Sequence, residues 1–304
     1  MGLDFKGRVA LVTGAGGGLG REHALALAAR GARVLVNDLG GAVNGEVPSG
    51  APTGAAQAVV DDIRSRGGEA IANTASVTDF DAVQAMVLQA IQAWGRIDIL
   101  VNNAGILRDK SFAKMEIDDF RLVLDVHLMG AVHCTRAVWP HMVGRKYGRV
   151  VMTTSSSGLY GNFGQSNYGA AKMALVGLMQ TLALEGEKHN IKVNCLAPTA
   201  VTRMTQALFS SDMQGAFGPE AVVPAMLVLA SEGAPTRTVL CAGAGGFASA
   251  HITLTRGVYV GTGADAAEQL ASRLAQATDR SGEVVPGSGT AQGANEMRLA
   301  RDRS

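Results

Sequence analysis

Short apolar runs alternate with longer segments of helical periodicity along most of the chain. The apolar runs are typical of strands buried on both faces and cover residues 9–12, 34–38, 70–73, 97–101, 149–153, 192–197 and 239–242. The helical segments cover residues 21–30, 55–66, 82–94, 120–142, 168–189 and 222–230. Such alternation builds a parallel sheet with helices on both faces. The pattern therefore predicts an α/β fold of the doubly wound, Rossmann type.

The final part of the chain has a different composition. Residues 264–278 carry Leu270 and Leu274 at helical spacing and predict one more helix, whereas residues 281–295 are rich in Gly and Ser, which favours a mobile segment. The chain has 304 residues, and α/β enzymes of about 250 residues often form one domain. We expect a single domain over residues 1–258 and a C-terminal extension, partly helical and partly flexible, over residues 259–304.

Charge and composition narrow the classes of function. The chain has 27 basic and 26 acidic residues, evenly spread, so it offers no basic patch for nucleic acid. No apolar stretch reaches the roughly 18 residues that cross a bilayer, and the Cys and His residues show no metal-ligand spacing. The first residues lack a signal peptide's apolar region, and the last four are not a peroxisomal address. We expect a cytoplasmic protein with a small-molecule ligand and without a nucleic-acid, membrane or metal partner.

A glycine-rich turn joins the first apolar run to the first helical segment. It reads Thr13-Gly14-Ala15-Gly16-Gly17-Gly18-Leu19-Gly20. Glycines let the backbone approach a pyrophosphate, and the following helix presents free amides and the positive end of its dipole. Because a strand precedes the glycines and a helix follows them, the turn predicts a dinucleotide site. Cofactor contacts are expected at Gly14, Gly18, Leu19 and Gly20.

The second apolar run ends in Asp38, eighteen residues after Gly20. This is close to the spacing of about 20 at which an acidic residue binds the adenosine ribose. A carboxylate there would repel a 2′-phosphate, and no Arg or Lys occupies residues 15–18 or 39–41, where a cation could bind that phosphate. We therefore predict NAD rather than NADP as cofactor. The alternative interpretation of Asp38 is a turn residue before Gly40 and Gly41.

Tyr168 and Lys172 lie four residues apart, and Ser155 lies thirteen residues before Tyr168. Positions i and i+4 share one face of a helix, so the phenol and the ammonium can point into the same cleft. A free phenol, with a pKa near ~10, is a poor base at neutral pH, and a neighbouring cation lowers that pKa. Ser155 can hydrogen-bond an oxygen that gains or loses a proton. The three residues suit proton removal from an alcohol while a hydride leaves its carbon.

At these residues the chain resembles the short-chain dehydrogenase/reductase family, over about residues 4–260. The motifs are the glycine turn, Asn102-Asn103-Ala104-Gly105, Ser155, and Tyr168-X-X-X-Lys172. The resemblance implies that Tyr168 is the catalytic acid/base and that Ser155 binds the substrate oxygen. It also implies that Lys172 lowers the pKa of Tyr168 and holds the nicotinamide ribose. The further cofactor contacts expected are Ser76, Val77, Asn103, Ala104, Gly105, Pro198 and Thr202, the last on the nicotinamide carboxamide.

Four stretches carry more specific information, at residues 36–41, 103–109, 160–165 and 203–206. In them the chain is similar to the (3R)-hydroxyacyl-CoA dehydrogenase part of peroxisomal multifunctional enzymes of type 2. This implies NAD-dependent oxidation of a secondary alcohol, with a (3R)-3-hydroxyacyl-CoA converted to the 3-oxoacyl-CoA. A hydroxysteroid or steroid side-chain CoA dehydrogenase is an alternative, because bacterial steroid-catabolic enzymes share much of the pattern.

Two further alternatives are disfavoured by particular residues. A 3-oxoacyl reductase of lipid synthesis usually uses NADPH, which conflicts with Asp38. A non-catalytic, NAD-binding redox sensor would not need Ser155, Tyr168 and Lys172 to be intact.

The chain departs from the general family pattern at His127, where relatives usually carry Asn in an Asn-X-X-Gly context that helps a water-linked proton path. A histidine can bond a water or a backbone carbonyl, so such a path can survive. We therefore treat His127 as a candidate catalytic residue. A packed and satisfied core histidine is the alternative.

Residues 198–219 form a long connection that contains apolar and flexible side chains. Connections of this length are usually functional, and the resemblance implies a substrate loop here. We expect a lid over a lipid-like substrate, with ordinary helix packing as the alternative. The lid candidates are Met204, Leu208 and Phe209.

Residues 168–184 are apolar beyond one core-facing stripe, so a second face is free to pack on another subunit. The resemblance supports a homodimer or homotetramer formed through such a helix. In relatives the C-terminal extension lies against the partner subunit, so we expect this tail to cap the active site across a dimer. A disordered tail from about Asp279 is the alternative.

Overall fold

The computed structural model describes residues 2–46, 54–203, 205–206, 210 and 215–302. These residues belong to two compact units, Met1–Ser249 and Ala250–Ser304. The boundary between the units lies N-terminal to the expected one at residue 258.

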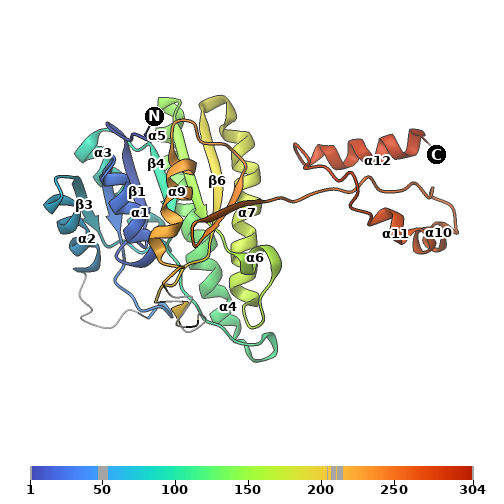
Figure 1. Cartoon of the computed structure of the whole chain (residues 1–304), viewed down its shortest axis with the longest axis horizontal. Helices are drawn as coiled ribbons and strands as arrows, with labels where there is room; N and C mark the ends of the chain where they lie inside the picture. The colour runs from blue at the N-terminus through green and yellow to red at the C-terminus, as the bar shows by residue number, and fades with distance from the viewer. Residues whose placement is uncertain (1, 47–53, 204, 207–209, 211–214, 303–304) are drawn as a thin grey trace. The chain divides into compact units, whose positions relative to one another are not determined.

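The first unit is built on an eight-stranded sheet in the order β3-β2-β1-β4-β5-β6-β7-β8 (Figure 1). The strands are β1 (Val9–Thr13), β2 (Arg33–Asn37), β3 (Glu69–Asn73), β4 (Ile99–Asn102), β5 (Gly148–Thr153), β6 (Ile191–Pro198), β7 (Val239–Gly243) and β8 (Gly246–Ala250). Every neighbouring pair from β3 to β7 is parallel. This confirms the predicted doubly wound, Rossmann-type sheet.

Helices connect the strands and cover the sheet. They are α1 (Gly18–Ala28), α2 (Gly54–Ser65), α3 (Phe80–Trp94), α4 (Ile117–Leu124), α5 (Gly130–Arg145), α6 (Ser156–Tyr160), α7 (Ser166–Gly186) and α9 (Val223–Ala230), with short 3₁₀ turns η1 (Phe112–Lys114), η3 (Glu187–His189) and η5 (Pro219–Val222). Every residue of β1, β4 and β5 is buried, because helices lie on both faces of the sheet. None of the helices in the described residues is long and apolar enough to cross a membrane.

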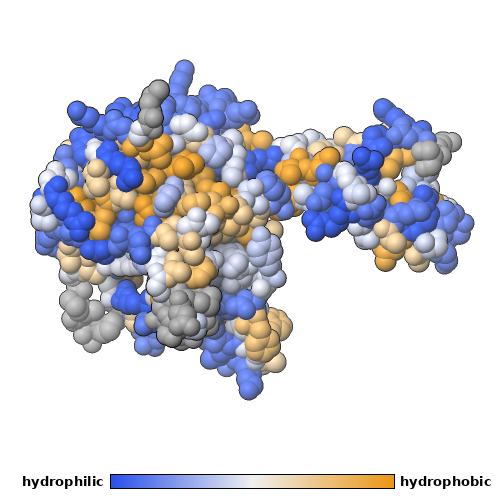
Figure 2. Space-filling model, viewed as in Figure 1, coloured by the Kyte–Doolittle hydropathy of each residue, from blue (hydrophilic) through white to orange (hydrophobic). Residues whose placement is uncertain are grey.

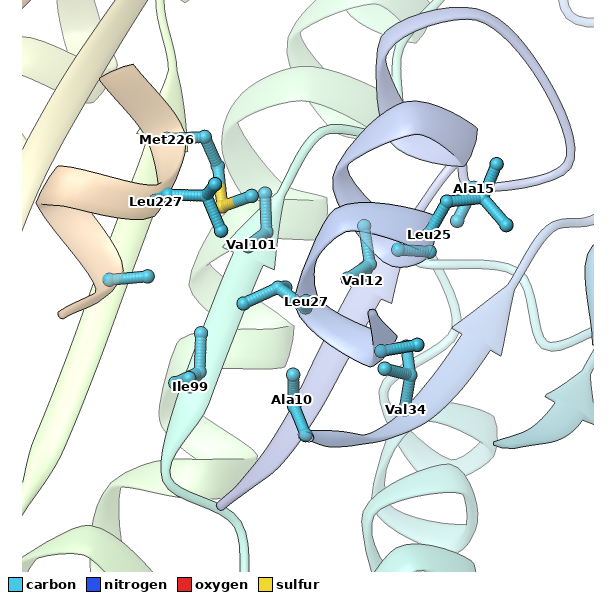
Figure 3. Close-up of a cluster of buried hydrophobic side chains, with 14 of the residues drawn as sticks. Ala10, Val12, Ala15, Leu25, Leu27, Val34, Ile99, Val101, Met226 and Leu227 are labelled. Carbon is cyan, nitrogen blue, oxygen red and sulfur yellow. The ribbon is translucent and has the colours of Figure 1, made fainter. Parts of the chain in front are cut away.

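One face of the sheet is covered by α1 and α9. In Figure 3, side chains of α1 and α9 point onto the strands, among them Leu27 from α1 and Met226 from α9, against Val12 of β1 and Val101 of β4. All four are completely buried, and burial of such a side chain stabilises the fold by roughly 1.5–3 kcal/mol. Apolar side chains also reach the surface over α9 (Figure 2), where Val228 is 44% exposed.

The single helix predicted over residues 120–142 is interrupted. Helices α4 and α5 are separated by a π-helical turn, η2 (Asp125–Met129), which places one additional residue in the turn. The turn is continuous with both helices, so its apolar pattern gives no sign of the change in hydrogen bonding. His127 lies at the centre of this turn and is buried.

The strand predicted over residues 239–242 is followed by another that the apolar pattern does not predict. Ala244 and Gly245 join β7 to β8, and both have positive φ angles, 49° and 76°. This is the backbone of a type I′ turn, whose twist suits a two-residue hairpin. The side chains of β8 are mostly exposed, Phe247 among them at 49%, so the strand lacks the apolar signal of its neighbours.

The second unit contains three helices in the described residues: α10 (Ala266–Ser272), α11 (Leu274–Ala277) and α12 (Thr290–Asp302). The helix predicted over residues 264–278 is present in two pieces that meet at Arg273. Helix α12 begins inside the stretch 281–295, so residues 290–295 of the segment expected to be mobile are helical. Ala, Gln, Glu, Met, Leu and Arg are good helix formers, and in α12 they outweigh one internal glycine.

Candidate functional site

The carboxyl ends of the central strands open into a cleft of about 390 Å³. Loops that follow β1, β2, β4, β5 and β6 supply its walls, as expected for a doubly wound sheet. The predicted residues that line it are Gly14, Gly18, Leu19, Asp38, Ser76, Val77, Asn103, Ala104, Gly105, His127, Ser155, Tyr168, Lys172, Pro198 and Thr202. Residues more than 150 positions apart in the sequence therefore meet at one site.

The glycine turn is held in place by the segment that follows β4. The Asn103 side chain donates to the carbonyl oxygens of Thr13 and Gly14, both at 3.0 Å. The Thr13 hydroxyl accepts from the backbone N–H groups of Asn103 and Ala104 at 3.0 and 3.1 Å. Gly14 has φ +61°, and a Cβ there would lie 2.7 Å from the Cα of Ala104. The turn is therefore tight for reasons of packing as well as ligand access.

Gly20 differs from the other predicted cofactor residues because it does not line the cleft. A Cβ at Gly20 would lie 2.3 Å from the carbonyl oxygen of Gly14. Its role is close packing of α1 against the turn, as for the third glycine of such motifs.

Asp38 directly follows β2 and lines the cleft. One carboxylate oxygen accepts from the backbone N–H of Gly16 and the other from that of Gly40, both at 2.8 Å. The bond to Gly40 organises the turn after β2, and the bond to Gly16 ties that turn to the glycine loop. Each oxygen keeps a lone pair that can accept a ribose hydroxyl.

Ser155, Tyr168 and Lys172 meet where β5 ends. Ser155 is the N-cap of α6 and accepts from the N–H of Ser157 at 3.2 Å. Lys172 is 3% exposed, donates to the carbonyl of Thr153 at 2.6 Å, and lies 5.4 Å from the centre of the Tyr168 ring. The spacing of four on α7 puts both side chains on the cleft side of that helix.

The ionisation of this trio follows from burial. Although Tyr168 is a partly exposed residue, desolvation of its phenol raises the pKa of Tyr168 to about 12, against a lowering effect of the hydrogen bond with Ser155. Burial lowers the pKa of Lys172 to about 7. The direction for Tyr168 is opposite to the one expected from a neighbouring ammonium, because burial outweighs every other influence and Lys172 is directed to the Thr153 carbonyl.

His127 lies between the loop after β4 and Tyr168. Its Nε2 lies 3.0 Å from the backbone N of Ile106 and 2.8 Å from the backbone O of that residue, so it pairs with one or the other according to tautomer. Its ring meets that of Tyr168 edge-on, at 5.1 Å between centroids. Burial, then the charge of Lys172, hold its pKa well below the usual value, so the ring is neutral. Nδ1 is buried and has no partner among the described residues, which a fully satisfied core histidine would not show.

The same ring restricts which residue can occupy position 105. A Cβ at Gly105 would lie 2.2 Å from Cε1 of His127. Glycine is needed here because the imidazole occupies the space that any other side chain would fill.

Gln165 lines the cleft, and no role was predicted for it from its residue type or position. Its Nε2 donates to Asp109 at 2.7 Å, and its Oε1 accepts from the side chains of Ser157 and Asn162 at 2.8 and 3.0 Å. It joins the loop after β4 to α6, beside Ser155. The only sequence signal was its place in one of the specific stretches, residues 160–165.

Arg203 is a second residue of this kind. It lines the cleft, and its Nη2 lies 3.5 Å from the position of a Cβ at Gly17. The neighbouring Thr202 lies over Gly18 in the same way, at 3.5 Å. Arg203 belongs to the loop after β6, far in sequence from residues 15–18 and 39–41, so the residues around the glycine turn give no sign of this cation. The lid candidates Met204, Leu208 and Phe209 lie outside the described residues.

Comparison with known proteins gives this geometry a context. The family model described as short chain dehydrogenase matches residues 8–213. Peroxisomal multifunctional enzyme type 2 of Mus musculus is 52% identical over 230 residues, which cover 76% of this chain and 30% of the mouse protein. The chain thus spans less than a third of that relative.

Two other matches extend over more of the chain. A putative short-chain type dehydrogenase/reductase, Rv0148, of Mycobacterium tuberculosis is 47% identical over 281 residues, covering 92% of this chain and 97% of that protein. The solved structure of full-length peroxisomal multifunctional enzyme type 2 from Drosophila melanogaster superposes with a TM-score of 0.79 at 37% identity. It covers 98% of this chain and 50% of the Drosophila one.

Proposed function

The chain belongs to the short-chain dehydrogenase family and is an oxidoreductase acting on CH–OH groups; we propose that it oxidises a (3R)-3-hydroxyacyl-CoA to the 3-oxoacyl-CoA with NAD. The observation that carries the proposal is the convergence of Ser155, Tyr168 and Lys172 on one cleft with the glycine turn and Asp38. The substrate class rests on the likeness to multifunctional enzymes of type 2.

The cleft has the features that a nicotinamide dinucleotide needs. Gly17 and Gly18 carry no side chain and line the cleft at the start of α1, where a diphosphate can approach the backbone amides. Asp38 stands at one end of the cleft for the adenosine ribose, and Lys172 at the other for the nicotinamide ribose. When bound, the oxidised nicotinamide accepts a hydride and adds a positive charge to the cleft.

The protein residues then handle the proton and the oxygen. Ser155 donates a hydrogen bond to the substrate oxygen and holds it beside the phenol. Tyr168 takes the hydroxyl proton, and the ammonium of Lys172 favours the phenolate over the phenol. Because burial of Tyr168 alone favours the neutral phenol, positive charge within the cleft is needed for activity near neutral pH.

The cofactor preference is proposed from Asp38. Its carboxylate is held by Gly16 and Gly40 and cannot turn away from a ligand without losing both hydrogen bonds. A 2′-phosphate would meet this fixed negative charge. We therefore expect NAD to be preferred over NADP.

Exposed apolar side chains on α7 support the proposal of a homodimer or homotetramer. Met173 is 38% and Leu184 46% exposed, on the helix whose other face carries Lys172. A chain that elutes as a monomer at micromolar concentration in light scattering would contradict this. The cytoplasmic location stays a prediction, and the curated relative in mouse carries a peroxisomal name.

The function is tested by following NADH formation with 3-hydroxyacyl-CoA thioesters of both configurations and several chain lengths. Hydroxysteroids and 3-hydroxyacyl forms of acyl carrier protein complete the panel, and each substrate is tried with NAD and NADP. We expect turnover with (3R)-thioesters and a higher kcat/KM with NAD. Turnover confined to (3S)-thioesters or to steroids would refute the proposed substrate, and a preference for NADP would refute the role of Asp38.

A further inference from the structure

Arg203 is a positively charged residue of the cleft that takes no part in the proposed proton transfer. Among the described residues that line the cleft, Lys172 is the one lysine and Arg203 is the one arginine. Lys172 is committed to the catalytic end, where it bonds the Thr153 carbonyl beside Tyr168. Arg203 lies at the glycine turn instead, next to Gly17. The two positive charges therefore serve different parts of any ligand that fills the cleft.

A short hydrogen-bonded turn fixes the backbone on which Arg203 stands. The N–H of Thr205 donates to the carbonyl of Thr202 at 3.0 Å, so Arg203 follows directly on the first residue of a β-turn. The Thr205 hydroxyl donates to the carbonyl of Ala200 at 2.6 Å and accepts from the N–H of Thr202 at 2.9 Å. These bonds tie the turn to the end of β6 and hold Arg203 over the start of α1.

The start of α1 offers a site for negative charge that the protein itself leaves open. Gly17 is the N-cap and has no side-chain cap, and the first turn of the helix contains no acidic residue. The free N–H groups and the positive end of the helix dipole, about half an elementary charge, face the cleft. A diphosphate carries about two negative charges, more than the helix end alone balances.

We infer that Arg203 binds the diphosphate of the dinucleotide, from the side opposite the amides of α1. The guanidinium presents several N–H donors in one plane and pairs with phosphate oxygens in bidentate fashion. The inference rests on the proposed use of a nicotinamide dinucleotide and names a cofactor-binding residue for it. Because its backbone is already held by Thr205, only the side chain of Arg203 has to be ordered on binding.

Two other phosphates are chemically similar, and the position of Arg203 argues against each. A 2′-phosphate would sit by Asp38, which contacts Gly16 and Gly40 rather than Gly17. The phosphates of an acyl-CoA belong to the substrate and would not need a cation above the N-cap of the cofactor helix. The diphosphate is the group for which both the helix end and the guanidinium are placed.

The test compares Arg203→Gln and Arg203→Lys with the wild-type chain by equilibrium titration. The ligands are NADH, NADPH, ADP-ribose, which keeps the diphosphate, and adenosine, which lacks it. For R203Q we expect the Kd of NADH and of ADP-ribose to rise by the same factor, about tenfold or more. The Kd of adenosine should be unchanged, and R203K should lie between wild type and R203Q. The matched control is Arg21→Gln on α1, whose guanidinium is paired with Glu22 and Asp62.

The possible failures are distinguishable. If wild type does not bind NADH, the proposed cofactor is wrong, and with it the premise of the inference. If wild type binds NADH and R203Q binds it equally well, the inference alone is overturned. Loss of NADPH binding without loss of NADH binding would assign Arg203 to a 2′-phosphate, and a raised KM for acyl-CoA alone would assign it to the substrate. Either result would overturn the diphosphate role.

Discussion

The buried polar groups at the two ends of the parallel strands differ in their hydrogen bonding. We call the side where the strands begin the amino edge of the sheet and the side where they end the carboxyl edge. At the amino edge, Arg149 is 1% exposed, and its guanidinium donates to four backbone carbonyls. Asp98 is completely buried there and accepts from Arg96 and from the N–H of Val9. At the carboxyl edge, Asn102 Oδ1, His127 Nδ1 and Thr153 Oγ1 are buried without a partner in the described part of the chain.

This difference separates stability from function within one sheet. A buried polar atom without a partner lowers stability by about 1–3 kcal/mol, so a fold that needed only stability would satisfy both edges alike. The buried polar side chains at the amino edge are hydrogen-bonded because their function is to hold the strands together. The carboxyl edge leaves polar atoms open where ligands bind to such sheets. Substitutions at the two edges should therefore change different measured quantities.

The largest expected effect is on catalysis at the carboxyl edge. Tyr168→Phe removes the phenolic oxygen that we propose takes the proton and should lower kcat about a thousandfold. Binding of NADH and the midpoint of thermal unfolding should change little, because the ring is kept. Steady-state kinetics and fluorescence titration check both. Tyr147→Phe, at the amino edge, is the control and should keep full activity. Turnover of Y168F near the wild-type rate would contradict the proposed proton path.

At the amino edge the effect should be on stability. Arg149→Met leaves the carbonyls of Gly148, Asn190, Ser231 and Glu232 without this donor and should lower the free energy of unfolding by about 3 kcal/mol. Urea denaturation measures it. Arg145→Met removes an exposed guanidinium bound to one carbonyl and should lower stability by less than about 1 kcal/mol. The comparison fails if R149M unfolds at the same urea concentration as wild type, or if its folded form loses activity.

A pH-dependent effect is expected from His23, a buried histidine of α1 whose two ring nitrogens have no partner in the part of the chain that the structure describes. Burial lowers its pKa from 6.5 to about 3. The unfolded chain therefore binds a proton that the folded chain refuses, so stability falls as pH drops from 6.5 towards 3. At pH 5 this amounts to about 2 kcal/mol.

His23→Leu should remove that part of the acid destabilisation. Urea denaturation at pH 7.5 and pH 5 would show a smaller difference for the variant than for wild type. Because the variant also removes two unpartnered nitrogens, its stability at pH 7.5 should not fall sharply. An identical pH dependence in the two proteins would show that His23 is not buried in its neutral form.

The smallest expected effect contrasts two adjacent threonines. Thr153→Val removes an unpartnered hydroxyl at the cleft and should raise the free energy of unfolding by about 1 kcal/mol. Thr154→Val removes a hydroxyl that donates to the carbonyl of Lys172 at 2.7 Å and should lower it by about the same amount. Calorimetry resolves the two. If both variants lose stability equally, the Thr153 hydroxyl has a partner and the contrast between the edges is weaker.

Local patterns were enough to predict much of this site. The glycine turn, Asp38 and the pair Tyr168 and Lys172 each lie in a short segment whose own secondary structure sets the spacing. The cofactor contacts predicted in these segments line the cleft except Gly20, whose role is packing. The parallel sheet was predictable for the same reason, because its strands are buried on both faces and are therefore continuously apolar.

Features that depend on distant segments could not be found in this way. Arg203 reaches Gly17 from the loop after β6, a strand that β4 and β5 separate from β1 in the sheet, and no local pattern carries that information. The π-helical turn at His127 keeps the apolar periodicity of its neighbours. Strand β8 is exposed and follows from the φ angles of Ala244 and Gly245. The sign of the pKa shift of Tyr168 depends on burial, which spacing alone does not report.

The close approach of His127 to Gly105 makes these two positions one steric unit. An added methyl group at residue 105 would push the imidazole against the Tyr168 ring, whereas a shorter side chain at residue 127 would free the space that the methyl group needs. The effects of substitutions at these two positions on activity and stability should then be strongly non-additive. A damaging Gly105→Ala substitution would be rescued by trimming a side chain 22 positions away in the sequence.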